Sequence, residues 1–276
     1  MQIDLSYSQS VPLVVSQHDH VMFLLVGAGG TGGFLIGAIA RLMKEIEATT
    51  NKTTSCTVID PDIIEAKNIP RQNFQPGDIG LPKAEVLAAR YALAMGCNIG
   101  AINQHFTIEM AKAHWHTLII VVGCVDNAAA RQTIAESLGR GNGTYYLPDT
   151  WWLDCGNHRT SGQVLLGSSS CFKFEKAFDN LAQPNFCKHL PSPALVHPEL
   201  LQPLPEEIAQ TPLSCAELIA RNQQSLFVNQ HVAAIASEYL LALTLTGGLR
   251  KFATYFDINS GSSRSLYTHP DTLARY

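Results

Sequence analysis

The chain has 276 residues, 46% of them hydrophobic, and its 19 basic and 23 acidic residues give a net charge of −4. A weakly acidic chain without a basic cluster is a poor candidate for binding nucleic acid. No apolar run reaches the roughly 18 residues of a membrane span, and no basic stretch precedes the first apolar residues as in a secretory signal. A protein of the cytoplasm without a membrane partner is expected.

The seven cysteines are odd in number, scattered, and never spaced as a CxxC pair. This usage favours reduced thiols and gives no reason to expect a zinc site. Nothing in the middle of the chain has the composition of a flexible linker, so we predict a single α/β domain over residues 1–276 with an elaborated second half.

Residues 1–19 alternate polar and apolar side chains and are predicted to form an edge strand or an arm. The apolar run 21–26 then ends on a cluster of glycines, and a helical pattern follows over residues 34–43. In a strand–turn–helix unit of this kind, Gly27 would allow the tight turn, Gly29 a close approach to phosphate, and Gly32 close packing of helix on strand. With Gly30 they predict a phosphate-binding turn at a helix N-terminus; the alternative is a tight turn for packing alone.

A second apolar strand is predicted at residues 55–60, closed by Asp60-Pro-Asp62. An acid at this strand end suits hydrogen bonds to ribose hydroxyls, although Asp before Pro is also ordinary turn chemistry. Residues 63–81 have no clear period, and a long irregular segment in a compact α/β domain is usually functional. Lys83 opens the next helical pattern, where its charge opposes the helix dipole, so an anion is expected beside it.

Further along, strands are predicted at residues 102–106 and 116–127, and a helix follows from residue 128. Asp126 ends the second strand, either as a helix cap or as a site residue, since strand ends of this architecture face the ligand crevice. Strands at 151–156 and 161–169 follow, the latter with an alternation that suggests antiparallel pairing. After a proline-rich stretch, a strongly apolar helix stops at Gly247 and Gly248 and a last pair of strands closes the chain.

Together these motifs resemble the adenylation domain of the superfamily of ThiF, MoeB and the ubiquitin-activating enzymes. The pattern GxGGxG, DxD, NxxRQ, DIGxxKA and DN with a later arginine occurs in order between residues 21 and 167. The resemblance implies a Rossmann-like, doubly wound, mostly parallel sheet with an antiparallel extension. Residues 1–167 would then be the nucleotide-binding half and residues 168–276 the substrate-binding half. The second half is similar to ThiF family proteins of the bacterial PRTRC system.

The family reaction joins the C-terminal carboxylate of a ubiquitin-like or sulfur-carrier protein, ending in glycine, to the α-phosphate of ATP and releases pyrophosphate. By this resemblance Arg71 and Lys83 stabilise the phosphate charge, and Asp126 holds Mg²⁺, which prefers hard oxygen ligands. The other implied roles are phosphate binding by Asn68, support of the irregular segment by Gln72, ribose binding by Asp60, and nucleotide contacts by Asp62, Asn127 and Arg131. The plain alternatives are an Arg131 paired with an acid of its own helix and a solvated surface Lys83.

Two departures from the family pattern stand out. Homodimers of the family often insert an arginine from the N-terminal region into the partner's site, yet the first arginine here is Arg41. The homodimer that the family implies would therefore use Arg41, another cation, or no trans arginine. The zinc-binding CxxC pairs of many relatives are missing as well.

A catalytic cysteine would take the acyl group from the adenylate as a thioester. Cys215 precedes helical sequence, and a helix N-terminus lowers a thiol pKa. Cys187 lies beside Lys188 and His189, which would have the same effect; Cys215 is favoured of the two, and neither being catalytic is equally possible. Cys124 and Cys155 end apolar runs and are expected to be inert core thiols.

Two other functions compete with this prediction. A non-catalytic nucleotide-binding scaffold that docks a partner would fit the missing arginine and zinc ligands. An NAD-dependent oxidoreductase would fit the glycine motif alone, but hydride transfer has no need of the NxxRQ motif or of Lys83.

Overall fold

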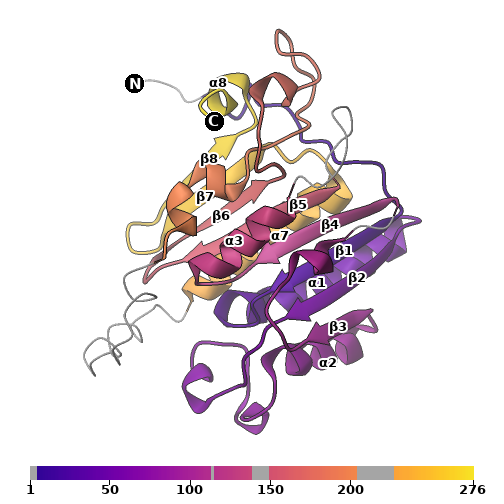
Figure 1. The fold of residues 1–276 in the computed structure, drawn as a ribbon, viewed down its shortest axis with the longest axis vertical. Helices are drawn as coiled ribbons and strands as arrows, with labels where there is room; N and C mark the ends of the chain where they lie inside the picture. Colours follow the sequence, from indigo (N-terminus) through magenta and orange to yellow (C-terminus); the bar gives the residue numbers. More distant parts are fainter. Residues whose placement is uncertain (1–4, 113–114, 139–148, 204–226) are drawn as a thin grey trace.

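The computed structural model describes residues 5–112, 115–138, 149–203 and 227–276. They build one eight-stranded sheet in the order β3-β2-β1-β4-β5-β6-β7-β8 (Figure 1). Neighbouring strands are parallel from β3 to β5 and antiparallel from β5 to β8. The predicted parallel sheet with an antiparallel extension is therefore confirmed. The strands are β1 (His20–Val26), β2 (Thr53–Ile59), β3 (Ile99–Ile102), β4 (Thr117–Gly123), β5 (Thr150–Asn157), β6 (Ser161–Gly167), β7 (Lys251–Asp257) and β8 (Ser262–Tyr267).

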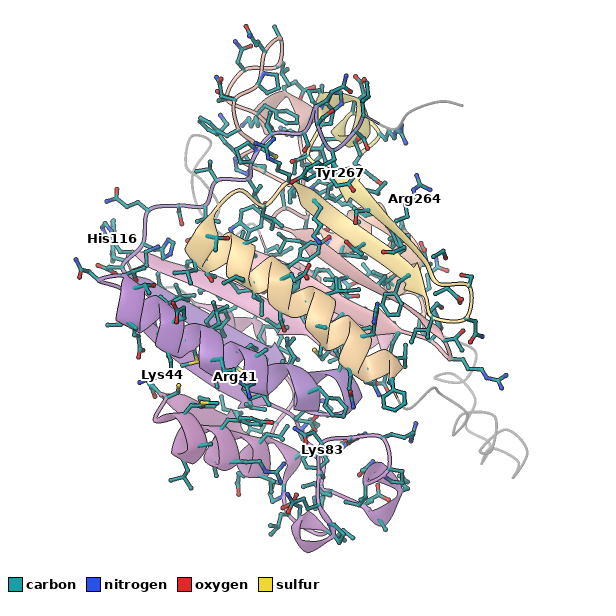
Figure 2. The ribbon with its side chains drawn as sticks, turned by 180° about the vertical axis from the view of Figure 1, so that it is seen from behind. Arg41, Lys44, Lys83, His116, Arg264 and Tyr267 are labelled. Carbon is teal, nitrogen blue, oxygen red and sulfur yellow. The ribbon has the colours of Figure 1, made fainter. Side chains whose placement is uncertain are left out.

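Helices cover both faces of the sheet, as in a doubly wound fold. Figure 2 looks onto the face that carries α1 (Gly30–Thr49), α2 (Lys83–Met95) and α7 (Val228–Leu241), with α1 lying against α2 and α7. The opposite face, in front in Figure 1, carries α3 (Ala128–Ser137) and α4 (Pro193–Val196). Short helical turns complete the chain: η1 (Ala66–Asn68), η2 (Pro76–Asp78), η3 (Ile108–Ala111), η4 (Phe174–Lys176), η5 (Pro198–Leu201), η6 (Ala242–Thr246) and α8 (Pro270–Leu273).

The central strands are buried on both faces, which explains their continuous apolar sequence. All seven residues of β4 are buried, and β1 contributes alternate side chains to the cores on its two faces. The chain leaves β1 toward β2 on one side and later adds β4 on the other. The strand order thus reverses between β1 and β4, and in sheets of this kind ligands bind outside the carboxyl ends of the strands at such a point.

Three predicted elements differ from the structure. The strand expected at residues 102–106 lies at Ile99–Ile102, and residues 5–19 form no regular strand, although Leu13 makes an isolated bridge with Cys187. The long apolar helix ends α-helical pairing at Leu241 and widens to a π-helical turn before Gly247, whose φ of +65° only glycine adopts readily. Among the described residues, no helix combines the length and the apolar character that crossing a membrane requires.

Candidate nucleotide-binding site

The turn between β1 and α1 requires glycine at two positions. Gly27 has a φ of +93°, and a Cβ atom there would lie 2.6 Å from the carbonyl oxygen of Cys124. A Cβ atom on Gly32 would lie 1.9 Å from the carbonyl oxygen of Gly27. Backbone atoms therefore occupy the space that a side chain at either position would need. The absence of these side chains permits the close packing of the turn and helix that the sequence predicts for these two residues.

Gly29 leaves the start of α1 without a side-chain cap, whereas Gly30 is covered by Asn229. Gly29 is the N-cap of α1 and provides no side-chain cap, so the first N–H groups of the helix keep their hydrogen-bonding capacity and their positive dipole end. The nearest atom to a Cβ on Gly29 would be Nε2 of Gln72, at 3.6 Å, whereas a Cβ on Gly30 would meet Nδ2 of Asn229 at 2.5 Å. A helix N-terminus of this kind is suited to binding a phosphate.

The two acids after β2 lie in different environments. Asp60 is 6% exposed and accepts hydrogen bonds from the backbone N–H groups of Ala28, at 2.6 Å, and Asp62, at 2.8 Å. Burial raises the pKa of Asp60, against the lowering effect of these bonds and of the Lys83 charge. Asp60 therefore supports the glycine turn directly, while the side chain of Asp62 is 63% exposed and is the more accessible acid.

Lys83 has the anion that its place at a helix start demands. Its Nζ lies 2.7 Å from Oδ2 of Asp62, and its side chain is only 8% exposed. The alternative of a solvated surface lysine is therefore wrong. Lys83 is the first residue of α2, where the irregular segment meets the helix in the lower part of Figure 2.

The irregular segment packs against the glycine turn. Asn68 is buried, and its side chain accepts from the N–H of Glu65 at 2.8 Å while its carbonyl oxygen accepts from the N–H groups of Arg71 and Gln72. Arg71 is half-buried and forms no ion pair with a described residue. Oε1 of Gln72 is buried without a hydrogen-bond partner among the described residues, close to Gly29. The segment thus brings the Gln72 amide beside Gly29, and it carries in Arg71 a cation that no described acid pairs with.

Two further side chains fix this segment in place. Nδ2 of Asn73 donates to the carbonyl oxygen of Gly33 at 2.8 Å and to the hydroxyl of Tyr91 at 2.9 Å. Arg90 of α2 donates to the carbonyl oxygen of Asn73 at 2.7 Å and to Asp78 at 2.6 Å. The aspartate of the DIG sequence therefore acts by holding the segment to α2.

Sequence reasoning missed a cluster of amides on the other side of the glycine turn. Asn229, in the first turn of α7, is 4% exposed and accepts hydrogen bonds from Oγ1 of Thr31, at 3.3 Å, and from Nδ2 of Asn157. Its own Nδ2 donates to the carbonyl oxygen of Arg71 at 3.5 Å. The end of β5, the start of α7 and the Arg71 segment therefore meet at Thr31. The sequence signal for this contact is limited to polar residues, such as Asn229, that interrupt apolar patterns.

The end of β4 presents Asp126 to solvent. Its side chain is exposed, while the next residue, Asn127, is the N-cap of α3 and accepts from the N–H of Ala130 at 2.8 Å. Capping is thus done by Asn127, and neither carboxylate oxygen of Asp126 bonds to a described residue. Among the described residues, no group of three His, Cys, Asp or Glu side chains could hold a metal ion. A cation at Asp126 would therefore need ligands from a phosphate, as Mg²⁺ in nucleotide sites usually has.

Arg131 is engaged by the protein itself. Its Nε donates to Oδ1 of Asp154 on β5 at 3.0 Å, and its Nη2 donates to the carbonyl oxygen of Val125 at 2.7 Å. The side chain is 12% exposed and that of Asp154 is fully buried. The alternative that Arg131 pairs with an acid of its own helix is wrong; the acid comes from the neighbouring strand.

Cys187 and Cys155 have the environment of inert thiols. Cys187 is 0% exposed, its Sγ donates to the carbonyl oxygen of His189, and burial raises its pKa to about 12. The expectation that Lys188 and His189 lower this pKa is wrong, because desolvation of the thiolate outweighs them. Cys155 is buried, and its pKa is raised by a hydrogen bond with half-buried Cys124 and by burial. Cys215 lies outside the described residues.

Arg41 lies on the outer surface of α1, where its Nη1 donates to the carbonyl oxygen of Gly37 in its own helix (Figure 2). Eleven residues separate it from Gly30, about 16 Å along the helix, so Arg41 is remote from the glycine turn of its own chain. It lines a shallow hollow of about 340 Å³ between α1 and α7, together with Phe34, Ala38, Gln230, Ala233, Ala234 and Ser237.

Solved structures of known proteins have a similar fold. Escherichia coli MccB solved with AMPCPP and MccA matches with a TM-score of 0.55 and 14% identity, and PaaA with 0.55 and 13%. MccB solved with ATP gives 0.53 and 15%. Each match covers 90% of this chain but only 64% of the other, so the chain spans less than two thirds of those proteins. At such identities the matches show the fold, and no curated protein matches the chain.

The sequence itself carries a family assignment. The model of the ThiF family matches residues 15–178, more than half of the chain, and this stretch includes the glycine turn, the irregular segment with Arg71 and Lys83, and the Asp126 turn. The chain belongs to the ThiF family.

Proposed function

We propose that the protein is an ATP-dependent adenylyltransferase that activates the C-terminal carboxylate of a protein or peptide. The observation that carries the proposal is that the segment bearing Arg71 packs against the N-terminus of α1, which has no side-chain cap: Gln72 lies beside Gly29, and Asn229 contacts the Arg71 carbonyl. Arg71 itself has no acidic partner among the described residues. The solved relatives support it, since MccB has been solved with ATP and with AMPCPP together with MccA.

In this reaction a carboxylate oxygen attacks the α-phosphorus of ATP and the bond to pyrophosphate breaks. Negative charge grows on the phosphate oxygens, so cations fixed in place beforehand lower the barrier. Arg71 is held through its backbone by Asn68 and Asn229. Lys83 has three N–H donors, and Asp62 is the one described residue that accepts from them, so the other two would be offered to phosphate oxygens.

In this proposal the three aspartates have different roles. Asp60 holds the glycine turn and Asp62, more exposed, is the better placed of the two for a ribose hydroxyl. Asp126, exposed on the turn that packs against Gly27 and Gly32, would hold Mg²⁺, which bridges and neutralises the phosphates. Gln72 and Asn127 would act through the backbone they support, and Asn68 through the Arg71 turn.

The partner that fits best is a ubiquitin-like or sulfur-carrier protein with a C-terminal glycine. The choice of partner rests on the resemblance of the second half to PRTRC-type ThiF proteins. The homodimer usual in the family is part of the same proposal. In such a homodimer, Arg41, another cation or no trans arginine at all would serve the partner's site. Transfer to Cys215 as a thioester would be a second step after adenylation.

ATP–pyrophosphate exchange tests the proposal. Wild type should exchange only when a ubiquitin-like partner with an intact C-terminus is present, and Arg71→Ala should lower the rate by about 10²-fold or more, as expected for loss of a transition-state cation. Lys67→Ala is the matched control, because Lys67 lies in the same segment, is 66% exposed and, among the described residues, pairs only with exposed Glu65. ATP binding without any exchange would favour a non-catalytic scaffold instead.

A further inference from the structure

A buried ion pair lies directly behind the turn that presents Asp126. Asp154 is fully buried in β5, and its Oδ1 accepts from Nε of Arg131 at 3.0 Å. Its second oxygen, Oδ2, has no hydrogen-bond partner among the described residues. Arg131 is therefore the main compensation for the buried carboxylate, whose pKa burial raises and Arg131 lowers.

The same guanidinium holds the backbone of the Asp126 turn. Nη2 of Arg131 donates to the carbonyl oxygen of Val125 at 2.7 Å, one residue before Asp126. One residue after it, the side chain of Asn127 caps α3. Asp126 thus lies between two anchored neighbours while its own side chain is exposed. This arrangement anchors the backbone from which the Asp126 carboxylate projects, without using its oxygens.

Stability alone is a weak reason for such a pair. A buried salt bridge can usually be replaced by apolar side chains of similar volume at little or no cost, because desolvation offsets the attraction between the charges. Here the sheet around Asp154 is strongly apolar, with Trp152, Leu153 and Leu165 all fully or almost fully buried. The feature that an apolar replacement would lose is the fixed guanidinium, and with it the hold on Val125.

We propose that Asp154 is a positioning residue for metal binding: it orients Arg131, which holds the Val125 carbonyl and so pre-organises Asp126 for the Mg²⁺ of a bound nucleotide. This inference rests on the proposed function only in taking Mg²⁺·ATP as the ligand. Neither Asp154 nor Arg131 touches the metal, and both act through the turn between β4 and α3. A displaced ligand must be reordered at each binding event, which weakens metal binding without removing the ligand.

The test measures metal binding without any turnover. Mn²⁺ serves as the probe, and its affinity for the protein saturated with a non-hydrolysable ATP analogue is followed by electron paramagnetic resonance. Asp154→Asn removes the charge that orients Arg131, and we expect the Kd for Mn²⁺ to rise about tenfold, within the range seen when partners of metal ligands are removed. Affinity for the analogue without metal should change less than twofold. Glu136→Gln, an exposed change on α3, is the control.

A second variant separates positioning from folding. Arg131→Lys keeps a charge for Asp154, but a single ammonium group cannot span both Asp154 and the Val125 carbonyl as the planar guanidinium does. It should therefore weaken Mn²⁺ binding as Asp154→Asn does while unfolding close to wild type. The double variant Asp154→Asn/Arg131→Lys should add no further loss, because both changes remove the same interaction.

The outcomes are distinguishable from those of the proposed function. Unchanged Mn²⁺ affinity in both variants, or no metal binding by the wild-type complex, would overturn the inference. The inference would also be overturned if the loss of Mn²⁺ affinity in the double variant were twice that of each single variant. Weakened metal binding in the variants, combined with no pyrophosphate exchange in wild type, would support the inference and refute the adenylation proposal.

Discussion

Gly32 offers the sharpest test of the glycine turn. In Gly32→Ala the added Cβ would lie 1.9 Å from the carbonyl oxygen of Gly27, about 1.1 Å closer than the 3.0 Å that real Cβ atoms keep. Both atoms belong to backbone, so no side-chain rotation relieves the clash and the turn must move by about 1 Å. Overpacking of this kind costs about 1–3 kcal/mol, against which the better helix propensity of alanine returns up to about 1 kcal/mol.

The functional effect should exceed the effect on stability. The turn that moves carries the N–H groups proposed to bind phosphate, and a misplacement of about 1 Å at a reacting group can cost about 10²-fold in rate. We expect Gly32→Ala to remain folded, to lose most of the thermal stabilisation given by saturating ATP, and to lose exchange activity.

Gly33→Ala is the matched control on the same helix. A Cβ at Gly33 would have its nearest contact at 3.4 Å, from Cβ of Asn73, which is an ordinary packing distance. This variant gains the same helix propensity without the clash, so its stability should equal or exceed that of wild type, with ATP stabilisation retained. Equal ATP stabilisation of Gly32→Ala and Gly33→Ala would refute the assignment of this turn to the nucleotide.

The remaining predictions concern the amide cluster, the thiols and pH. Asn229→Ala should lower the free energy of unfolding in urea by about 1–3 kcal/mol, because the Thr31 hydroxyl and the Arg71 carbonyl would lose the buried amide of Asn229 as a partner; a loss below about 0.5 kcal/mol would show that the cluster is not formed. In the native protein, iodoacetamide should alkylate exposed Cys171 but not Cys187, whose pKa burial raises to about 12; rapid labelling of Cys187 would contradict its burial. Burial lowers the pKa of His18 and His189 below the usual 6.5, so the unfolded chain takes up their protons first as the pH falls. Their contribution to stability is complete above pH 6.5 and is lost as the pH falls toward the folded-state pKa values. The Tm of the double variant His18→Gln/His189→Gln should therefore fall less than that of wild type as the pH is lowered from about 7.5 to 5.5. Buried carboxyls are common to both proteins and cancel in this comparison. An equal fall in Tm for the two proteins would refute the prediction.

Local sequence was sufficient for the frame of the site. Apolar runs ending on glycine or acid fix where the strands β1, β2 and β4 stop, since a run buried on both faces has no alternative environment. Gly27 and Gly32 follow from the steric needs of a strand–turn–helix unit, and Lys83 begins α2 where the sequence placed it. All these features depend on residues close together in the chain.

The partners within the site were decided by tertiary structure. Asn229 lies 198 residues from Thr31, and Asp154 lies 23 residues from Arg131 on a different element, so no local pattern links either pair. The sequence likewise named both Asp60 and Asp62 but could not show which would be buried. Cys187 illustrates the same limit: its charged neighbours in sequence suggest a lowered pKa, while burial by distant segments raises it. Desolvation and hydrogen-bond pairing depend on which elements pack together, and that is a property of the folded chain alone.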